Sequence, residues 1–99
     1  MNMKLINKGS EGEVLLEGRL DATTAPEAEE LLKETADRFD KLILNFASLD
    51  YISSAGLRVL KILHVIMRKK GGSLVLTNVN SMIMEVFEMT GFAGLLEFE

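Results

Sequence analysis

The sequence predicts an α/β fold: a mixed sheet of four to five strands, with an N-terminal hairpin and parallel later strands, packed with about three helices. Two short strand-like runs open the chain, a compact apolar run follows the first helical pattern, and strand and helix patterns then alternate. Such alternation is typical of parallel strands joined by right-handed helical crossovers. With 99 residues, 47% of them hydrophobic, we expect one domain spanning residues 1–99.

The first part of the chain should form a hairpin and then a helix. Residues 4–7 and 14–17 are the strand-like runs, and the turn-rich segment Gly9-Ser10-Glu11-Gly12 separates them. Thr24 is expected to cap the helix by accepting from its first amides, with Glu27 reaching back to the cap. The spacing of apolar side chains predicts a sheet-facing stripe made of Ala28, Leu31, Leu32, Thr35 and Phe39.

A central strand and a second helix should follow. Residues 41–46 are a short apolar run, as expected of a strand buried on both faces. The helix should open at Ser53-Ser54-Ala55-Gly56 and end at Gly71-Gly72. Its apolar side chains predict burial over most of its circumference, apart from one narrow polar stripe formed by Arg58, Lys61, His64 and Arg68.

The C-terminal part should add a strand at residues 73–77 and a third helix. Asn80 or Ser81 can cap this helix, which should run to about Thr90 and stop at Gly91 in a left-handed conformation. Residues 95–98 can add a last short strand.

Composition excludes several classes of function. A formal net charge of −4 leaves no basic field for nucleic acid. The absence of cysteine excludes disulfides and thiolate chemistry, and the single histidine, His64, supplies too few ligands for a structural metal. No apolar stretch approaches membrane-spanning length or resembles a signal peptide, so we expect a cytoplasmic protein with no membrane insertion, no metal and no cofactor.

Polar residues gather where strands are expected to end. The loops that leave parallel strands share one edge of a sheet, and here they are residues 21–24, 50–56 and 78–81, with Ser53 and Ser54 at the centre. A serine at a helix start usually only caps it. If Ser53 is the cap, Ser54 keeps a spare hydroxyl at the positive end of the helix, where a phosphate would be tolerated.

The segment Leu49-Asp50-Tyr51-Ile52-Ser53-Ser54-Ala55-Gly56-Leu57-Arg58-Val59-Leu60 resembles the phosphoacceptor segment of STAS domains in anti-sigma factor antagonists. Gly18-Arg19-Leu20-Asp21-Ala22, Leu42-Ile43-Leu44-Asn45-Phe46 and Met89-Thr90-Gly91-Phe92 resemble the family in order and spacing. The resemblance implies a STAS fold and phosphorylation two residues before the glycine, at Ser54, with Ser53 as the alternative acceptor. Many phosphorylated members have aspartate where this chain has Ser53.

The resemblance implies a partner switch as the leading hypothesis. The unmodified chain would bind an anti-sigma factor or a related serine kinase or regulatory ATPase, phosphorylation would reverse this, and a phosphatase could reset it. We expect the partner to contact Asp21, Thr23, Thr24, Ser53, Ser54, Arg58 and Asn78. Asp21 matches the family's aspartate near the acceptor, although an aspartate that bonds its own loop amides is an equal alternative. A monomer is expected.

Two alternatives remain. The chain could be a scaffold or a transport-complex subunit that is not phosphorylated, with Ser54 only capping a helix. It could instead be an enzyme with a nucleophilic Ser54, but His64 lies about 15 Å away by helical rise, and no nucleophile elbow or phosphate loop is present. We expect no enzyme and no catalytic residues.

Overall fold

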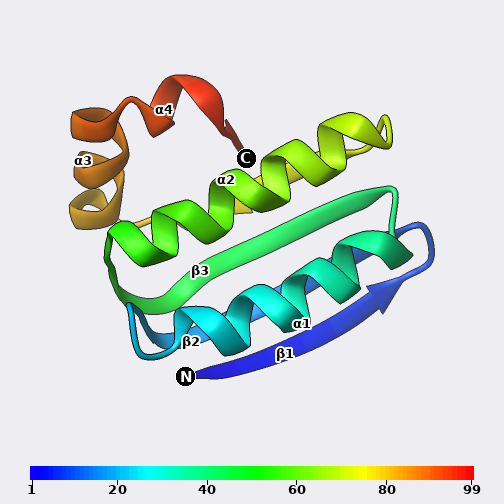
Figure 1. Cartoon of the computed structure of the whole chain (residues 1–99), viewed down its shortest axis with the longest axis horizontal. Helices are drawn as coiled ribbons and strands as arrows, with labels where there is room; N and C mark the ends of the chain where they lie inside the picture. Colours follow the sequence, from blue (N-terminus) through cyan, green and yellow to red (C-terminus); the bar gives the residue numbers. More distant parts are fainter.

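Five strands in the order β1-β2-β3-β4-β5 form one sheet in the computed structural model, which describes residues 1–99 (Figure 1). β1 pairs with β2 antiparallel, and all other neighbours are parallel. This mixed α/β sheet with an N-terminal hairpin is the predicted fold class. The elements are β1 (Asn2–Lys8), β2 (Glu11–Leu20), α1 (Ala25–Arg38), β3 (Lys41–Ile52), α2 (Ser54–Lys69), β4 (Ser73–Thr77), α3 (Ser81–Thr90), α4 (Phe92–Leu95) and β5 (Glu97–Phe98).

The hairpin turn is shorter than the sequence suggested. Only Gly9 and Ser10 connect the strands, because Glu11 and Gly12 already pair with β1. The Asn7 side chain accepts from the Gly9 amide at 3.0 Å, and Gly9 has a φ of 83°, which favours glycine. Gly12 lies against Phe39, and the nearest atom of the Phe39 ring would be 2.5 Å from a Cβ added to Gly12. Gly12 is therefore a packing residue and not a turn residue.

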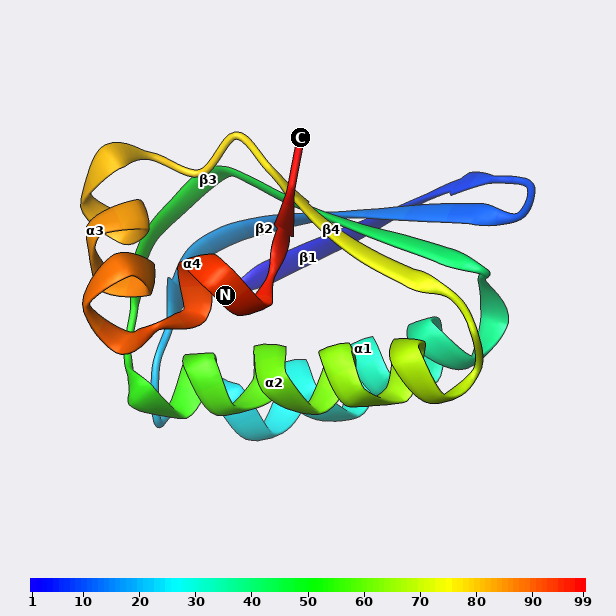
Figure 2. The same cartoon turned by 90° about the horizontal axis from the view of Figure 1, so that it is seen from above.

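Helices α1 and α2 cover one face of the sheet, and the other face carries no helix (Figure 2). The main core lies between this helix layer and the sheet, and it includes Leu16, Leu32, Phe46, Leu60, Leu63, Leu76 and Phe87. α2 and β4 follow the predicted bounds closely. Asn80 caps α3 through a 2.8 Å bond from the Ile83 amide, and Gly91 ends it with a φ of 84°, as predicted. No helix is long and apolar enough to cross a bilayer.

Two apolar positions are more exposed than their spacing predicted. Leu31 of α1 is 45% exposed, so the buried stripe of α1 uses Ala25 and Ala36 in its place. On α2, Val65 is 39% exposed, and burial over most of the circumference was wrong for this helix. Both errors arise because periodicity does not say how wide a stripe the neighbouring elements cover.

β3 is twice as long as the predicted central strand. It continues to Ile52, and its register against β2 shifts twice, with one extra β3 residue each time. Such bulges bend a strand and increase its twist. The predicted loop at residues 50–56 is consequently reduced to Ser53, and α2 begins directly afterwards.

Candidate functional site

Ser54 is the first residue of α2 and its side chain is exposed. The first amides of a helix have no partner within the helix and, with the helix dipole, favour negative charge nearby. Charge added to the Ser54 hydroxyl would therefore meet solvent and the positive end of α2.

Ser53 occupies the N-cap position in an extended conformation, as predicted, but its side chain does not cap the helix. Its backbone amide donates to the Leu20 carbonyl at 2.9 Å, and its carbonyl accepts from the Leu57 amide at 3.0 Å. The Ser53 Oγ is buried and has no hydrogen-bond partner. The main chain of Ser53 thus joins β2 to α2, while its hydroxyl is inaccessible.

Gly56 allows α2 to approach the ends of β2 and β3. A Cβ at this position would lie 2.7 Å from the Ile52 side chain, 2.8 Å from the Leu20 side chain and 2.9 Å from the Leu20 carbonyl oxygen. These contacts are too short for any side chain. The glycine two residues after Ser54 therefore has a packing role, which fixes the first turn of α2 and with it the position of Ser54.

Asp21 organises the loop between β2 and α1. Its Oδ1 accepts from the Thr23 amide at 3.0 Å and the Thr24 amide at 3.2 Å. The Thr24 amide, followed by smaller contributions from Thr23 and Arg19, lowers the pKa of the Asp21 carboxyl. Asp21 therefore bonds the amides of its own loop, which was the alternative interpretation of this aspartate from the sequence.

The predicted capping box at α1 is wrong. The Thr24 hydroxyl donates to the Arg19 carbonyl at 2.8 Å and accepts from the Asp21 amide at 3.0 Å, so it bonds to the loop and not to the helix. The Asp21 carbonyl instead accepts from the Ala25 amide at 2.8 Å. Pro26 lies in the first turn of α1, where its missing amide has no partner to lose.

Arg58 lies one turn after Ser54 on α2. Its guanidinium is 3.6 Å from the Glu29 carboxylate of α1, and its side chain is 74% exposed. A hollow of about 370 Å³ lies beside it and is lined mostly by small side chains: Ala22, Ala25, Pro26, Glu29, Ala55 and Arg58. A side chain from another protein could enter this hollow next to Ser54.

Asn78 is not brought to the same place. β4 ends where Thr77 pairs with Asn45, seven residues before the end of β3. The backbone of Asn78 has a φ of 56°, and the side-chain amide of Asn78 donates to Asn45 Oδ1 at 3.1 Å. Asp21, Thr23, Thr24, Ser53, Ser54 and Arg58 therefore gather at the end of β2 and β3, whereas Asn78 lies further back along the sheet.

Two residues at this end were missed in the sequence. The Arg19 guanidinium lies 4.2 Å from the centre of the Tyr51 ring, and Arg19 and Tyr51 are paired across β2 and β3. Tyr51 is 41% exposed. Exposed aromatic residues are enriched in protein interfaces. The signal was present in the sequence, since Tyr51 is the only tyrosine and lies three residues before Ser54.

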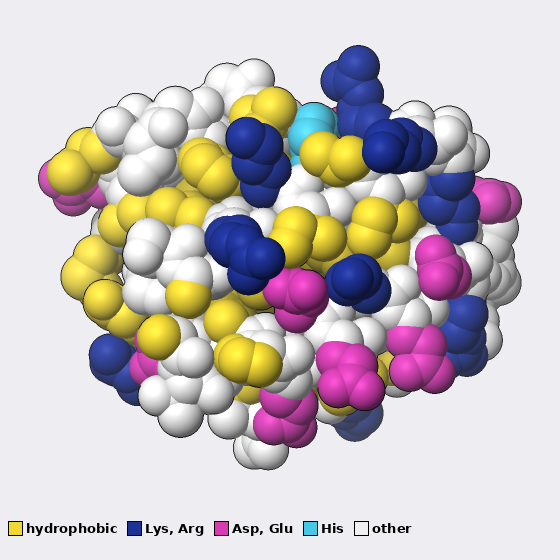
Figure 3. Space-filling view, in the orientation of Figure 1, with side chains coloured by type: hydrophobic (Ala, Val, Ile, Leu, Met, Phe, Trp, Pro, Cys, Tyr) yellow, Lys and Arg dark blue, Asp and Glu magenta, His cyan; other side chains and the backbone are white.

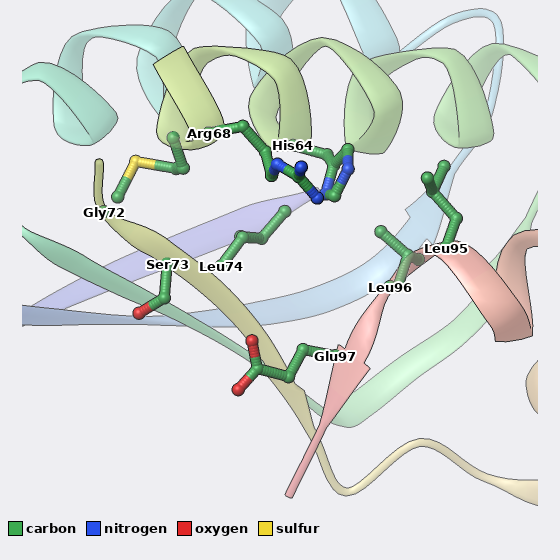
Figure 4. A pocket seen from close by; sticks show the side chains of 9 residues that line it. His64, Arg68, Gly72, Ser73, Leu74, Leu95, Leu96 and Glu97 are labelled. Atoms are coloured by element: carbon green, nitrogen blue, oxygen red, sulfur yellow. The ribbon is translucent and has the colours of Figure 1, made fainter. Parts of the chain in front are cut away.

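His64 is half-buried and not on a fully solvated stripe. With Arg68 it projects from α2 toward Leu74, in a cleft of about 200 Å³ bounded by residues 95–97 (Figure 4). No three His, Cys, Asp or Glu side chains are grouped as a metal site requires. The Asp21 carboxylate is engaged by its own loop and makes no hydrogen bond to Ser54, as a general base for a nucleophilic serine would.

Comparisons with known proteins agree on one family. A model of the STAS domain matches residues 6–99. The chain is 36% identical over 81 residues to the anti-sigma factor antagonist BtrV of Bordetella bronchiseptica, covering 81% of this chain and 70% of that protein. It is 27% identical over 99 residues to the anti-sigma-B factor antagonist of Bacillus subtilis, covering 98% of this chain and 91% of that protein. The structure of phosphorylated SpoIIAA, a Bacillus cell fate determinant, superposes with a TM-score of 0.77 at 17% identity, covering 99% and 91%.

Proposed function

The chain belongs to the STAS domain family of anti-sigma factor antagonists, and we propose that within it the chain acts by binding an anti-sigma factor with serine kinase activity until Ser54 is phosphorylated. Members of this family are regulatory proteins, and this chain is not an enzyme. The observation that carries the proposal is the exposed Ser54 at the start of α2, beside Ser53, whose Oγ is buried. Ser53, the alternative acceptor, is disfavoured because a kinase cannot reach a buried oxygen.

The surroundings of Ser54 suit a protein interface. The hollow next to Ala55 and Arg58 can receive a partner side chain, and the exposed Tyr51 adds apolar contact area. Arg58 is exposed and only weakly paired, at 3.6 Å from Glu29, so it can meet an acidic group on the partner. Together these residues and the 21–24 loop form the proposed contact surface.

Phosphorylation of Ser54 would act on this surface directly. A phosphoserine carries about −1.5 to −2 charges at neutral pH. It would lie one helical turn from Arg58, attract its guanidinium and repel an acidic partner group that the guanidinium had bound. Burying the phosphate at the interface should cost on the order of 2 to 5 kcal/mol, which is roughly 30-fold to several-thousand-fold in affinity.

Substitution of Ser54 tests the proposal. Ser54→Ala should bind the anti-sigma factor constitutively, and Ser54→Asp should bind at least about tenfold more weakly by isothermal titration calorimetry. The matched control is Ser81→Asp, because Ser81 is also an exposed first residue of a helix, α3, and has no part in the proposed surface. Equal affinities of the Ser54→Ala and Ser54→Asp forms would refute the switch.

The scaffold hypothesis makes a different prediction. A non-phosphorylated scaffold or transport-complex subunit would show no phosphate on Ser54 after incubation with ATP and the kinase that it binds, by tandem mass spectrometry. The switch predicts phosphate on Ser54 and none on Ser53. The proposal places the protein in the cytoplasm, with a phosphatase that restores the unmodified hydroxyl.

A further inference from the structure

The two helices of the helix layer carry opposite charge. α1 contains five acidic and two basic residues, whereas α2 contains four basic residues and no acidic residue. The helices lie side by side and run in the same direction (Figure 1). Glu30 and Glu34 of α1 and Lys61 and Lys69 of α2 are exposed. Figure 3 shows the result on the surface, with acidic side chains over α1 and basic ones over α2.

An apolar groove lies between these two bands. It has a volume of about 510 Å³ and is lined by Ile62, Val65 and Ile66 together with Lys33, Arg58 and Lys61. Apolar side chains are visible along the middle of this face (Figure 3). One carboxylate, Glu29, approaches the cations of the groove, at 3.6 Å from Arg58 and 3.8 Å from Lys33.

We propose that this helix layer is a self-association surface, through which two copies of the chain pair about a two-fold axis parallel to α1 and α2. Rotation about an axis that runs along the groove exchanges the two sides of the layer. The acidic α1 of each copy then faces the basic α2 of the other, and the apolar grooves meet on the axis. The contact is isologous and closed, as in most homodimers.

The charge pattern also excludes other arrangements. Consider instead a two-fold axis that lies in the plane of the interface but runs perpendicular to the helices. It would place α1 on α1 and α2 on α2, with like charges opposed. An anionic membrane would be attracted by α2 but repelled by α1, which lies in the same layer. A second copy carries both bands and complements them, while Glu29 offsets part of the positive charge that lines the groove at the axis.

The dimer should be weak and sensitive to salt. Two helices from each copy give an interface at or below the small end of stable complexes, and exposed charges are screened within about 10 Å at 0.1 M salt. From the sequence a monomer was only the default, because the placement of the acidic helix beside the basic one appears only in the fold. A parallel axis leaves Ser54 of both copies at the same end of the dimer, and the inference does not depend on phosphorylation.

Charge reversal on each band tests the dimer, by sedimentation equilibrium over a range of protein and salt concentrations. Lys61→Glu/Lys69→Glu lowers the formal charge of α2 from +4 to 0 and leaves α1 at −3, so the attraction between the bands is lost. Glu30→Lys/Glu34→Lys changes α1 from −3 to +1 opposite the +4 of α2, so the two bands repel. Each variant alone should dimerise at least about tenfold more weakly than the wild type. An equimolar mixture should form a heterodimer, because the acidic α1 of the first variant faces the basic α2 of the second, and the other two bands barely repel. Lys4→Glu, which changes an exposed cation on β1, is the matched control and should leave the affinity unchanged.

The mixture keeps the test decisive even if one variant is less stable, because only folded chains that pair with each other can produce a species with the mass of a dimer. A wild type that stays monomeric at every protein concentration in low salt would overturn the proposal. So would a dimer that neither variant weakens, or a mixture no heavier than its separate components.

Discussion

Ser53 and Ser54 are adjacent in the chain, but their hydroxyls have different surroundings. The backbone of Ser53 is held by Leu20 and Leu57, which turns its side chain into the protein, where the oxygen has no partner. Ser54 is one residue further along and faces solvent. A kinase requires an accessible oxygen, so the difference between the two serines is set by backbone hydrogen bonds and not by their chemistry.

The orphan hydroxyl of Ser53 leads to a prediction about stability. Removing a buried polar atom that makes no hydrogen bond costs little, so Ser53→Ala should change the free energy of unfolding by less than about 0.5 kcal/mol or raise it. Asn80 is the matched cap, since its Oδ1 accepts from the Ile83 amide at 2.8 Å. Asn80→Ala should lose about 1 kcal/mol. If Ser53→Ala and Asn80→Ala lose the same free energy of unfolding in urea denaturation, the Ser53 hydroxyl does make a stabilising hydrogen bond and this account of it is wrong.

At the scale of the element, the first turn of α2 depends on Gly56. Alanine at this position should lower the free energy of unfolding by about 1 to 3 kcal/mol, because its Cβ would meet the Leu20 carbonyl as well as two side chains. Gly94→Ala is the control, since no atom lies within 4 Å of a Cβ there. If Gly56→Ala is as stable as the control in thermal denaturation, α2 does not pack on β2 as described.

The sheet face without helices is stabilised by ion pairs around two buried apolar residues. Ile43 and Val75 are 8% and 1% exposed but lie outside the main core cluster. Ile43 of β3 pairs in register with Val75 of β4 on one side and with Glu13 of β2 on the other. Glu13 contacts Lys8 at 2.7 Å and Asn45 at 3.0 Å. This ion pair thus lies beside Ile43 on a sheet face that no helix covers.

This network predicts a pH dependence of stability. The hydrogen bond from Lys8, and then that from Asn45, lowers the pKa of the Glu13 carboxyl. A carboxylate with a lowered folded pKa stabilises the fold above its ordinary pKa, and this stabilisation is lost as the pH falls through the folded value. The free energy of unfolding should therefore decrease between about pH 5 and pH 3, with a smaller slope in Glu13→Gln. Glu17→Gln, exposed on the same strand and outside these ion pairs, should retain the wild-type slope, and a parallel loss of slope in both variants would contradict the assignment.

The elements that the sequence predicted well are those with strong local signals. Asn80 and Gly91 mark the ends of α3 by their own chemistry, and the apolar run at residues 73–77 has the length of β4. The extension of β3 to Ile52 was not predictable, because its alternation is interrupted by two bulges that depend on β2. Asn78 was misplaced for the same reason: only the register shows that β4 ends well before β3.

At the scale of the whole molecule, the chain presents three surfaces, the first two of which meet at Arg58. The end of β2 and β3 carries Ser54 and its polar neighbours, the helix layer carries the two charged bands, and the opposite sheet face carries the ion pairs around Ile43. A phosphate on Ser54 would act on the first surface and, through Arg58, on the adjoining end of the groove in the helix layer. The fold can therefore stay constant while partner binding changes.

The most direct test is to phosphorylate the full chain and measure both the site and its consequence. After incubation with ATP and the anti-sigma factor kinase, tandem mass spectrometry should find the phosphate on Ser54. The phosphorylated protein should bind the unmodified kinase at least about tenfold more weakly, with an unchanged circular dichroism spectrum. Phosphate on another residue, or full affinity with Ser54 phosphorylated, would contradict the account.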